Sequence, residues 1–315
     1  MTYLRYVARR GLFAVLAAYL VVVATFLLGT MTIRDQIANR LAAAGYRGTG
    51  TMSGFRAGLY AAYDLNEPLV DRLVGWLVDV TTLDAGESMY YDEPVLAVLD
   101  GRIATTLEYV VPGVLLAVLL GALLGLATAL ARESRFDWGV RLGGYVLLAI
   151  PVFVLLTYMQ TAAGQVVGFG GWRVALPAPG KQTLAAFGVG LSLLAGQIRF
   201  ARAAALEQTG RSFVKMLHAK GIGRLRLARH VLRNAAIPIV SISIADLLAV
   251  LVLNIYVIEE VLRIEGLAGA SLRAAIKSDI PLLMWSTMVV VVLGITASFL
   301  QDVLHGYLDP RVGTD

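Results

Sequence analysis

Long apolar stretches separated by shorter polar segments dominate the chain. A helix that crosses the hydrocarbon core of a bilayer needs about 20 mostly apolar residues. The stretches lack the alternation of apolar and polar residues that is typical of barrel strands, so each is expected to be a helix. The pattern predicts an all-α, polytopic membrane protein with six transmembrane helices. Their predicted bounds are residues 11–33, 109–131, 142–161, 182–198, 234–258 and 280–301.

Composition supports the membrane assignment and excludes some kinds of chemistry. Hydrophobic residues make up 58% of the 315 residues and the mean hydropathy is +0.72, whereas soluble domains are about 45–50% apolar. The chain has no cysteine, which excludes disulfides and thiol catalysis. In a membrane protein the position of the charges matters more than the net charge of +5. No nucleic-acid partner is therefore expected.

The distribution of Lys and Arg predicts the orientation of the chain. With both termini in the cytoplasm, the inside segments carry more basic than acidic residues and the outside segments carry more acidic than basic residues. The positive-inside rule favours this arrangement, in a multi-pass protein of the cell membrane. The first apolar stretch could be a cleaved signal peptide. Its length and the lack of an obvious cleavage site favour a retained membrane helix instead.

The segment between the first two predicted membrane helices is long enough to form a small extracytoplasmic subdomain. The pattern divides the chain into a first membrane helix at 1–33, this subdomain at 34–103 and a five-helix membrane domain at 104–315. Residues 67–77 within the subdomain predict an amphipathic helix that begins near Pro68. Its apolar face is expected to consist of Leu69, Leu73, Trp76 and Leu77.

The predicted cytoplasmic loop at 199–234 has a helix-turn-helix pattern. Phe213, Met216 and Leu217 recur at i, i+3 and i+4, which places them on one face of a short helix. Gly221 and Gly223 then predict a turn, and a second helix is expected after it. Its apolar side is expected to contain Leu225, Ala228 and Leu232, with Arg226, Arg229, His230 and Arg233 around it.

Two roles are open for this loop on its residue pattern. A short amphipathic helix with an exposed apolar face can dock in a groove of a soluble partner. Alternatively, the basic residues can bind anionic lipid head groups, at about 1 kcal/mol for each charge.

The loop resembles a known family. The run Ala-Lys-Gly at 219–221 and the run Arg-His-Val-Leu-Arg-Asn-Ala-Ala-Ile-Pro at 229–238 are similar to the cytoplasmic loop of permease subunits of binding-protein-dependent ABC importers. The form is that of the dipeptide, oligopeptide and nickel branch. The long external segment resembles that of the first permease of such pairs. Further matches lie in the same order along the chain, at 4–10, 104–108, 279–281 and 308–312.

The chain departs from the family pattern at three places. Lys215, Met216 and Leu217 stand where many importers have a glutamate and two alanines. Ile-Glu-Gly-Leu-Ala at 264–268 replaces Trp-Pro-Gly-Leu-Gly, and residues 251–253 lack the usual glycines. These changes leave the docking role of the loop intact and leave the substrate open between a dipeptide, an oligopeptide, nickel and another solute.

The resemblance implies a permease that forms half of a translocation pathway by alternating access. Its implied partners are a second, homologous permease, two cytoplasmic ATPase subunits and an extracytoplasmic substrate-binding protein. No cofactor or ATP site is expected in this chain, because residues 179–183 only partly match a phosphate loop. The implied coupling residues are Phe213, Lys215, Met216, Leu217, His218, Ala219, Lys220, Gly221, Arg229, His230, Arg233 and Asn234.

Polar side chains within predicted spans are the candidates for the pathway. Asp246 is acidic, and an ionisable side chain near mid-bilayer costs about 2.5–3.5 kcal/mol, so it is expected to face a cavity or a partner. Asn254 lies about two turns further along. Gln160 and Gln197 are weaker candidates, because amides also join neighbouring helices. For each of these residues, a structural hydrogen bond is the alternative.

Two other functional classes fit parts of the sequence less well. A secondary transporter or channel would not need the docking loop, and more intramembrane charge or inverted repeats would be expected. An intramembrane serine protease would pair Ser192 with His305, but the two residues are expected at different depths. No histidine has metal-ligand spacing to another, so no metal site is expected.

Overall fold

The structure is a computed structural model of the whole chain. It describes residues 3–46, 57–58, 60, 65–169, 172–175, 178–249 and 253–308. Within these ranges, side chains are not described at 32–46, 166–175, 218, 224, 237–238, 240–249, 304–305 and 307–308.

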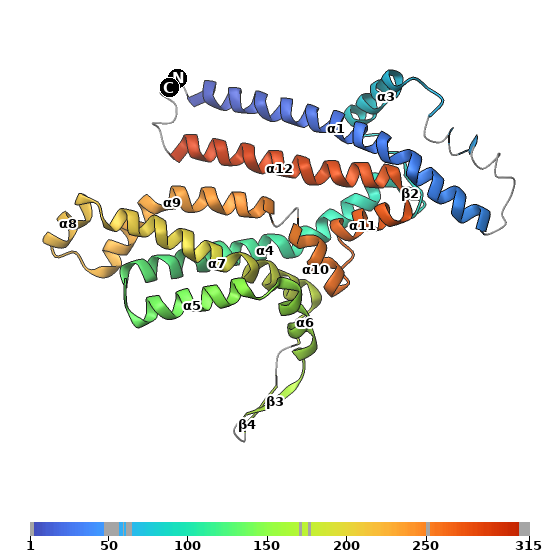
Figure 1. Ribbon diagram of the computed structural model, residues 1–315. Coiled ribbons are helices and arrows are strands. Elements are labelled where there is room, and N and C mark those ends of the chain that lie inside the picture. The colour runs from blue at the N-terminus through green and yellow to red at the C-terminus, as the bar shows by residue number, and fades with distance from the viewer. Residues whose placement is uncertain are drawn as a thin grey trace. The chain divides into compact units, whose positions relative to one another are not determined.

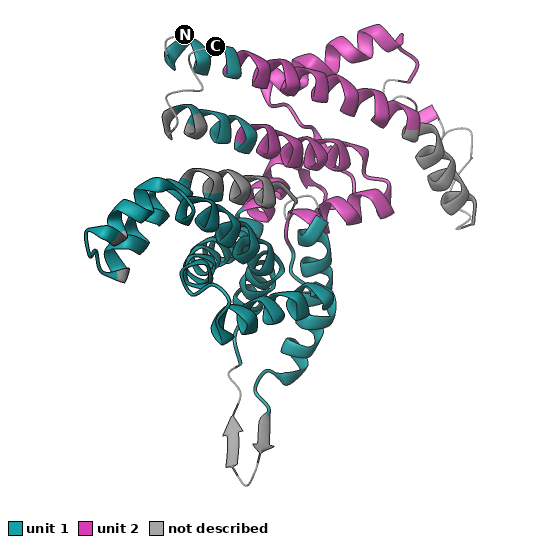
Figure 2. Ribbon diagram, turned by 60° about the vertical axis from the view of Figure 1, so that its left-hand side comes forward, with its two compact units in different colours: residues 1–10, 104–265, 297–315 teal, residues 11–103, 266–296 magenta. Residues whose placement is uncertain are grey.

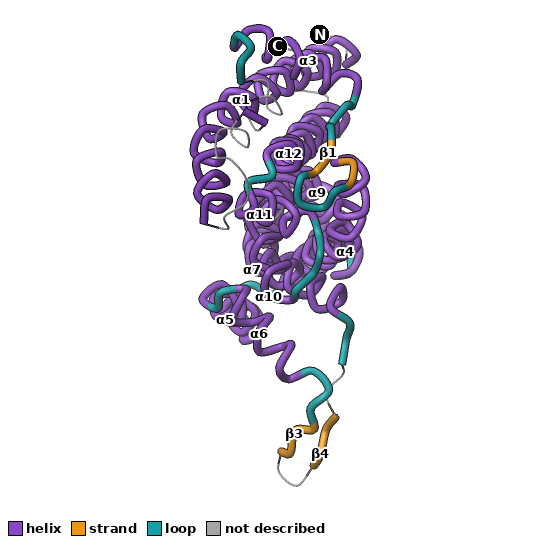
Figure 3. The backbone as a smooth tube through the Cα atoms, turned by 90° about the vertical axis from the view of Figure 1, so that its right-hand side faces the viewer, coloured by secondary structure: helices purple, strands orange, loops and turns teal. Residues whose placement is uncertain are grey.

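The described chain is predominantly helical, as the sequence predicts, and its strands are confined to two short antiparallel hairpins (Figures 1 and 3). The hairpins are β1 (Glu87–Ser88) with β2 (Glu93–Pro94), and β3 (Val166–Phe169) with β4 (Trp172–Ala175). The helices are α1 (Tyr3–Tyr46), α3 (Leu69–Thr82), α4 (Val95–Leu130), α5 (Arg135–Ala149), α6 (Val152–Ala162), α7 (Lys181–Thr209), α8 (Ser212–Ala219), α9 (Arg224–Ala249), α10 (Ile255–Leu262), α11 (Leu267–Lys277) and α12 (Ile280–Leu308).

Within the described residues, four helices are long and apolar enough to cross a membrane, or five spans if one bent pair counts as a span. The prediction of a polytopic helical membrane protein is confirmed, and the number six is not. The four segments are Tyr3–Met31, Val95–Leu130, Lys181–Thr209 and Ile280–Val303. They correspond to the first, second, fourth and sixth predicted spans.

The third predicted span is wrong as a single helix, because α5 and α6 meet at an angle of 94°. The break lies at Ile150 and Pro151. Proline has no N–H to continue the helical hydrogen bonds, and it pushes the residue before it out of the helical region. Ile150 accordingly has φ −92° and ψ 116°, and Pro151 is the N-cap residue of α6.

The fifth predicted span, 234–258, is divided between two elements. Helix α9 begins earlier than expected and ends at Ala249. A π-helical turn at Leu253 and Asn254 precedes α10. Most side chains in the middle of this stretch lie outside the described residues, including that of Asp246.

The chain forms two compact units (Figure 2). The first comprises residues 1–10, 104–265 and 297–315, and the second comprises residues 11–103 and 266–296. In the first unit, α7 contacts α5, α6, α9 and α10. Gly113 and Gly125 let α4 approach α7 closely. A Cβ atom at Gly125 would lie 2.6 Å from the Cβ of Ala201, and one at Gly113 would lie 2.6 Å from the carbonyl oxygen of Ala186.

The ends of α1 and α12 that belong to the first unit are joined by polar contacts. The Tyr3 hydroxyl donates to the carbonyl oxygen of Val303 at 3.2 Å, and the Tyr6 hydroxyl donates to that of Asp302 at 3.3 Å. Arg10 forms an ion pair with the Asp302 carboxylate at 3.2 Å. These contacts hold the two terminal segments next to each other.

The second unit has an apolar core that includes Trp76 of the predicted amphipathic helix. The Trp76 indole donates to the carbonyl oxygen of Val22 at 3.0 Å and packs edge-on against Trp285, with ring centroids 5.8 Å apart. Leu73 and Leu77 pack around this core, whereas Leu69 is exposed. The helix prediction at 67–77 is therefore confirmed for most of its apolar face.

Candidate functional site

Helices α8 and α9 form the helix-turn-helix that the sequence predicts for the loop at 199–234. Gly221 lies in the turn between them with φ +68°, a left-handed conformation that favours glycine. A Cβ atom at Gly221 would meet nothing within 4 Å. The conformation of the backbone, rather than crowding, is therefore what calls for glycine at this position.

One side of α8 is packed against the ends of α4, α7 and α9. Val214 is buried, and Phe213 and Leu217 pack beside it. Full burial of an aliphatic side chain of this size contributes about 1.5–3 kcal/mol. The other buried members of this cluster are Leu126, Ala129, Ala205, Leu227 and Val231. Helix α8 is therefore attached to the membrane helices along its length.

The opposite side of α8 and of the start of α9 is exposed. Met216 is 52% exposed, so it does not share the packed face of Phe213 and Leu217, and the predicted single apolar face is wrong in this respect. The other predicted coupling residues that are exposed are Lys215, Ala219, Lys220, Gly221, Arg229, His230, Arg233 and Asn234. The side chain of His218 lies outside the described residues.

The packed face of α9 also differs from the prediction. Leu225 is 86% exposed, whereas Leu227 and Val231 are buried. Ala228 and Leu232 do pack against the cluster, as expected. The correction follows from helical geometry, because residues 225 and 227 are about 200° apart around a helix. Met216 and Leu225 are thus two exposed apolar side chains beside the basic residues of this surface.

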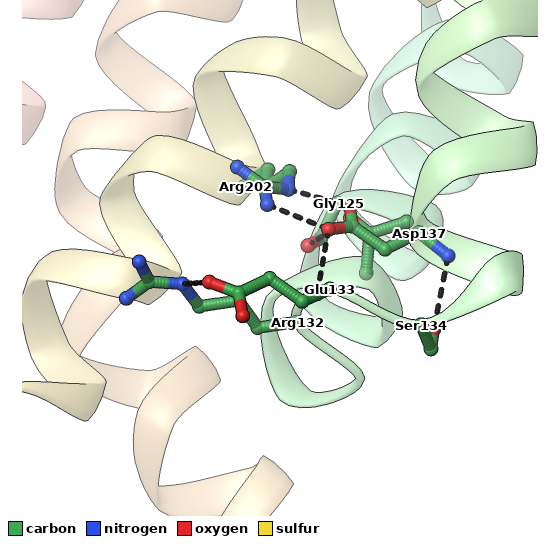
Figure 4. Close-up of polar contacts among 7 residues, drawn as sticks. Gly125, Arg132, Glu133, Ser134, Asp137 and Arg202 are labelled. Carbon is green, nitrogen blue, oxygen red and sulfur yellow. Dashed lines mark hydrogen bonds and ion pairs between the residues drawn. The ribbon is translucent and has the colours of Figure 1, made fainter.

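An ion pair between the buried Asp137 and the partly buried Arg202 joins α5 to α7 (Figure 4). Arg202 donates from Nε to Asp137 Oδ1 and from Nη2 to Asp137 Oδ2, each at 2.8 Å. Asp137 Oδ2 also accepts from the backbone N–H of Glu133 at 3.1 Å, and Ser134 caps the first turn of α5 by accepting from the Asp137 N–H. Two parallel charge-assisted hydrogen bonds fix both distance and orientation. The turn between α4 and α5 is thereby fastened to α7.

The sequence analysis did not identify this ion pair. The spacing Ser134 to Asp137 is a local signal for a helix start. Nothing local connects Asp137 to a partner that lies 65 residues further along the chain.

The structure describes the side chains of three of the four candidate pathway residues, which lie on α7, on α6 and just before α10. Gln197 is buried on α7, and Asn254 donates to the Ser192 hydroxyl at 3.4 Å. Gln160 is exposed on α6. Asp246 lies on α9, with its side chain outside the described residues. The sequence predicts one helix through Asp246 and Asn254, but α9 ends at Ala249, between the two residues.

A buried carboxylate that the sequence analysis did not select lies between α4 and α10. Glu259 Oε1 accepts from the Thr106 hydroxyl at 2.7 Å and from the Tyr109 hydroxyl at 2.9 Å. All three residues are buried. The i, i+3 spacing of the Thr and Tyr on one helix face is a signal for such a site, but their partner is distant in sequence.

Known proteins are similar to this chain over most of its length. Residues 117–314 match the family described as the binding-protein-dependent transport system inner membrane component. The dipeptide transport system permease protein DppB of Bacillus subtilis is 27% identical over 267 residues, 84% of this chain and 85% of the relative. The metal-staphylopine import system permease protein CntB of Staphylococcus aureus is 26% identical over 257 residues, 79% of this chain and 80% of the relative. The oligopeptide transport system permease protein AppB of Bacillus subtilis is 25% identical over 271 residues, 79% of this chain and 82% of the relative.

The match to the family covers more than half of the chain and includes α5 to α12 and the helix-turn-helix. A transport system of this kind needs a substrate-binding protein and ATPase subunits as partners, and this component is the permease rather than the ATPase. The chain therefore belongs to the family of multi-pass inner membrane permeases of binding-protein-dependent ABC transporters.

Proposed function

We propose that the chain is one of two homologous permeases in an ATP-driven importer of peptides or a similar small solute. The relatives named above support this substrate class, because two are permeases for a dipeptide or an oligopeptide and one is for a metal-staphylopine complex. Each permease would form half of the pathway and alternate between outward-facing and inward-facing states. The small external subdomain at 34–103 would help to seat the binding protein.

The observation that carries this proposal is the two-sided environment of α8. Phe213, Val214 and Leu217 attach the helix to the membrane domain, while Lys215 and Met216 stay exposed. A coupling element needs both properties. It must contact a soluble subunit, and it must be stiffly connected to the helices that move. A short helix in a groove of the ATPase would transmit closure of the ATPase pair to α4 and α7.

The proposed topology places both termini and α8 in the cytoplasm. The contacts of Tyr3, Tyr6 and Arg10 with the end of α12 support placing both termini on the same side of the membrane. The excess of basic residues at 199–234 supports the cytoplasm as that side. Asp246, Asn254, Gln197 and Gln160 remain the proposed polar residues of the pathway, and ATP hydrolysis is left to the partner subunits.

A site-specific cross-link tests the docking of α8. The chain has no cysteine, so a single Met216→Cys substitution creates a unique thiol on the exposed side of α8. A benzophenone-maleimide attached there should form a covalent product with the ATPase subunit in membranes that contain the whole importer. Thr161→Cys, which is exposed on α6, serves as the matched control and should not form this product. Equal cross-linking from both positions, or none from position 216, would refute the docking surface.

A further inference from the structure

A groove of about 510 Å³ lies between α5 and α7 in the first unit. Four arginines line it, together with one acidic residue, Glu133. Two of the arginines are neutralised locally, since Arg132 pairs with Glu133 at 3.2 Å and Arg202 pairs with Asp137.

The other two arginines of the groove, Arg141 and Arg199, are exposed. Among the described residues, neither is within ion-pairing distance of a carboxylate. The Arg199 guanidinium lies 5.1 Å from the centroid of the neighbouring Phe200 ring, which leaves its N–H donors available. Asp137, one turn before Arg141, interacts with the Arg141 charge, but both of its oxygens accept hydrogen bonds from Arg202. The groove therefore presents two cationic groups on facing helices, and no carboxylate accepts from their N–H donors.

The groove changes from basic to apolar along its length. On α5, Arg141, Tyr145 and Leu148 follow one another on one helix face at i, i+4 and i+7. A Cβ atom at Gly144 would lie 3.9 Å from that of Ala195, which shows that α5 and α7 meet at this level. Past Arg141 and Arg199 the lining is mostly apolar and includes Leu148 on α5 and Ala195 on α7, with Ile198 directly beside Arg199.

The position along the helices fits the edge of a bilayer. Helix α7 is a candidate membrane span, and α5 belongs to the bent pair that can form another. Trp138, one turn before Arg141, is 65% exposed. Tryptophan is enriched at the level of the lipid head groups, and basic pockets between membrane helices bind anionic head groups.

We propose that this groove binds one anionic phospholipid, with its phosphate between Arg141 and Arg199 and an acyl chain along Leu148 and Ile198. The two positive charges favour a lipid whose head group has a phosphate and no cationic group. The apolar end of the groove favours a lipid over a free anion. The lipid lies beside the Asp137–Arg202 pair, on the same helices. The inference does not depend on the identity of the transported solute.

Retention of lipid by the purified importer tests this site. The assembled complex is placed in nanodiscs of phosphatidylcholine and phosphatidylglycerol, then released and analysed by native mass spectrometry. The wild-type complex should retain phosphatidylglycerol in preference to phosphatidylcholine. Each arginine near an anionic head group contributes roughly five-fold, so Arg141→Gln with Arg199→Gln should weaken retention roughly 25-fold.

Two comparison variants separate charge from misfolding. Arg5→Gln with Arg135→Gln removes the same charge from exposed residues that do not line the groove, and this variant should retain phosphatidylglycerol like the wild type. Arg141→Lys with Arg199→Lys keeps both charges and should retain most of the binding. Two results would overturn the assignment. One is an equal loss of phosphatidylglycerol from both Gln variants. The other is a loss from the Lys variant equal to that from the Arg141→Gln, Arg199→Gln variant.

Two further experiments, displacement and cross-linking, identify the molecule that occupies the groove. Excess glycerol 3-phosphate should not displace the lipid, because it lacks the acyl chain, and full displacement would mean that the groove binds a phosphate group alone. A photoreactive residue in place of Leu148 should cross-link to a phospholipid. Cross-linking to a protein subunit instead would show that a partner covers the groove and would overturn the lipid site.

Discussion

Arg202 on α7 binds Asp137 on α5 through two hydrogen bonds of 2.8 Å, and the Asp137 side chain is only 1% exposed. Loss of Arg202 is costly, because the Asp137 carboxylate then stays out of water without its partner. Arg202 lies on the segment of α7 that also carries Ala205 and Leu206, which pack in one apolar cluster with residues of α8. We therefore expect the ion pair to hold in place the part of α7 against which α8 packs.

Removing one partner of this pair should destabilise the protein. Arg202→Ala leaves the buried Asp137 carboxylate without its partner and should lower the stability by about 3–5 kcal/mol, which a thermal unfolding assay of the purified complex would detect. Glu133→Ala provides the control, because its ion pair with Arg132 is exposed and should contribute less than about 1 kcal/mol. If both variants unfold at the same temperature, the Asp137–Arg202 pair contributes no more to stability than the exposed Arg132–Glu133 pair.

Gly221 and Gly223 give a second matched pair in the turn before α9. A Cβ atom would meet open space at either position, but only Gly221 has a positive φ. Gly221→Ala should strain the turn by roughly 1 kcal/mol and reduce the uptake obtained for each ATP hydrolysed. Gly223→Ala should behave like the wild type in a proteoliposome assay of uptake and hydrolysis. Equal effects of the two changes would contradict this role for the conformation of Gly221.

The exposed and packed sides of α8 should respond differently to substitution. Met216→Glu should change stability by less than about 0.5 kcal/mol, because the side chain is exposed, yet it should impair coupled uptake. Val214→Ala removes buried methyl groups and should lower the stability by about 1–3 kcal/mol. Uptake and unfolding temperature are measured on the same preparations. A Met216→Glu importer with normal uptake would remove Met216 from the coupling contact.

Gly125 should not tolerate a side chain, because α4 and α7 are closely packed there. In Gly125→Ala the new Cβ would lie 2.6 Å from that of Ala201 and 2.7 Å from the backbone nitrogen of Arg202, so the helices must separate at a cost of about 1–3 kcal/mol. Gly143→Ala on α5 meets nothing within 4 Å and should leave stability unchanged or slightly higher. Unfolding temperatures of the two variants, measured side by side, check this difference.

Features that depend on local sequence could be predicted, and features that depend on distant partners could not. The glycine turn at Gly221 and the short helix before it follow from spacing and turn residues. The break at Pro151 is also local, but the apolar composition of 142–161 obscures it. The rotation of α9 that exposes Leu225 depends on how the helix packs against α4 and α7, and the apolar pattern alone allows another face.

The candidate site shows the same division. The exposed basic residues of the loop could be selected from the sequence, whereas the separation of Met216 from Phe213 required the packing of α8. The ion pair of Asp137 with Arg202 and the contacts of Glu259 with Thr106 and Tyr109 join residues that are 65, 153 and 150 positions apart. A single sequence contains no signal for such pairings.

Co-purification of the tagged chain from gently solubilised membranes tests the central claim most directly. If the chain is one permease of an ATP-driven importer, a second homologous permease and two ATPase subunits should be recovered with it and identified by mass. Recovery of the chain alone, in a detergent that keeps a known importer assembled, would contradict the account.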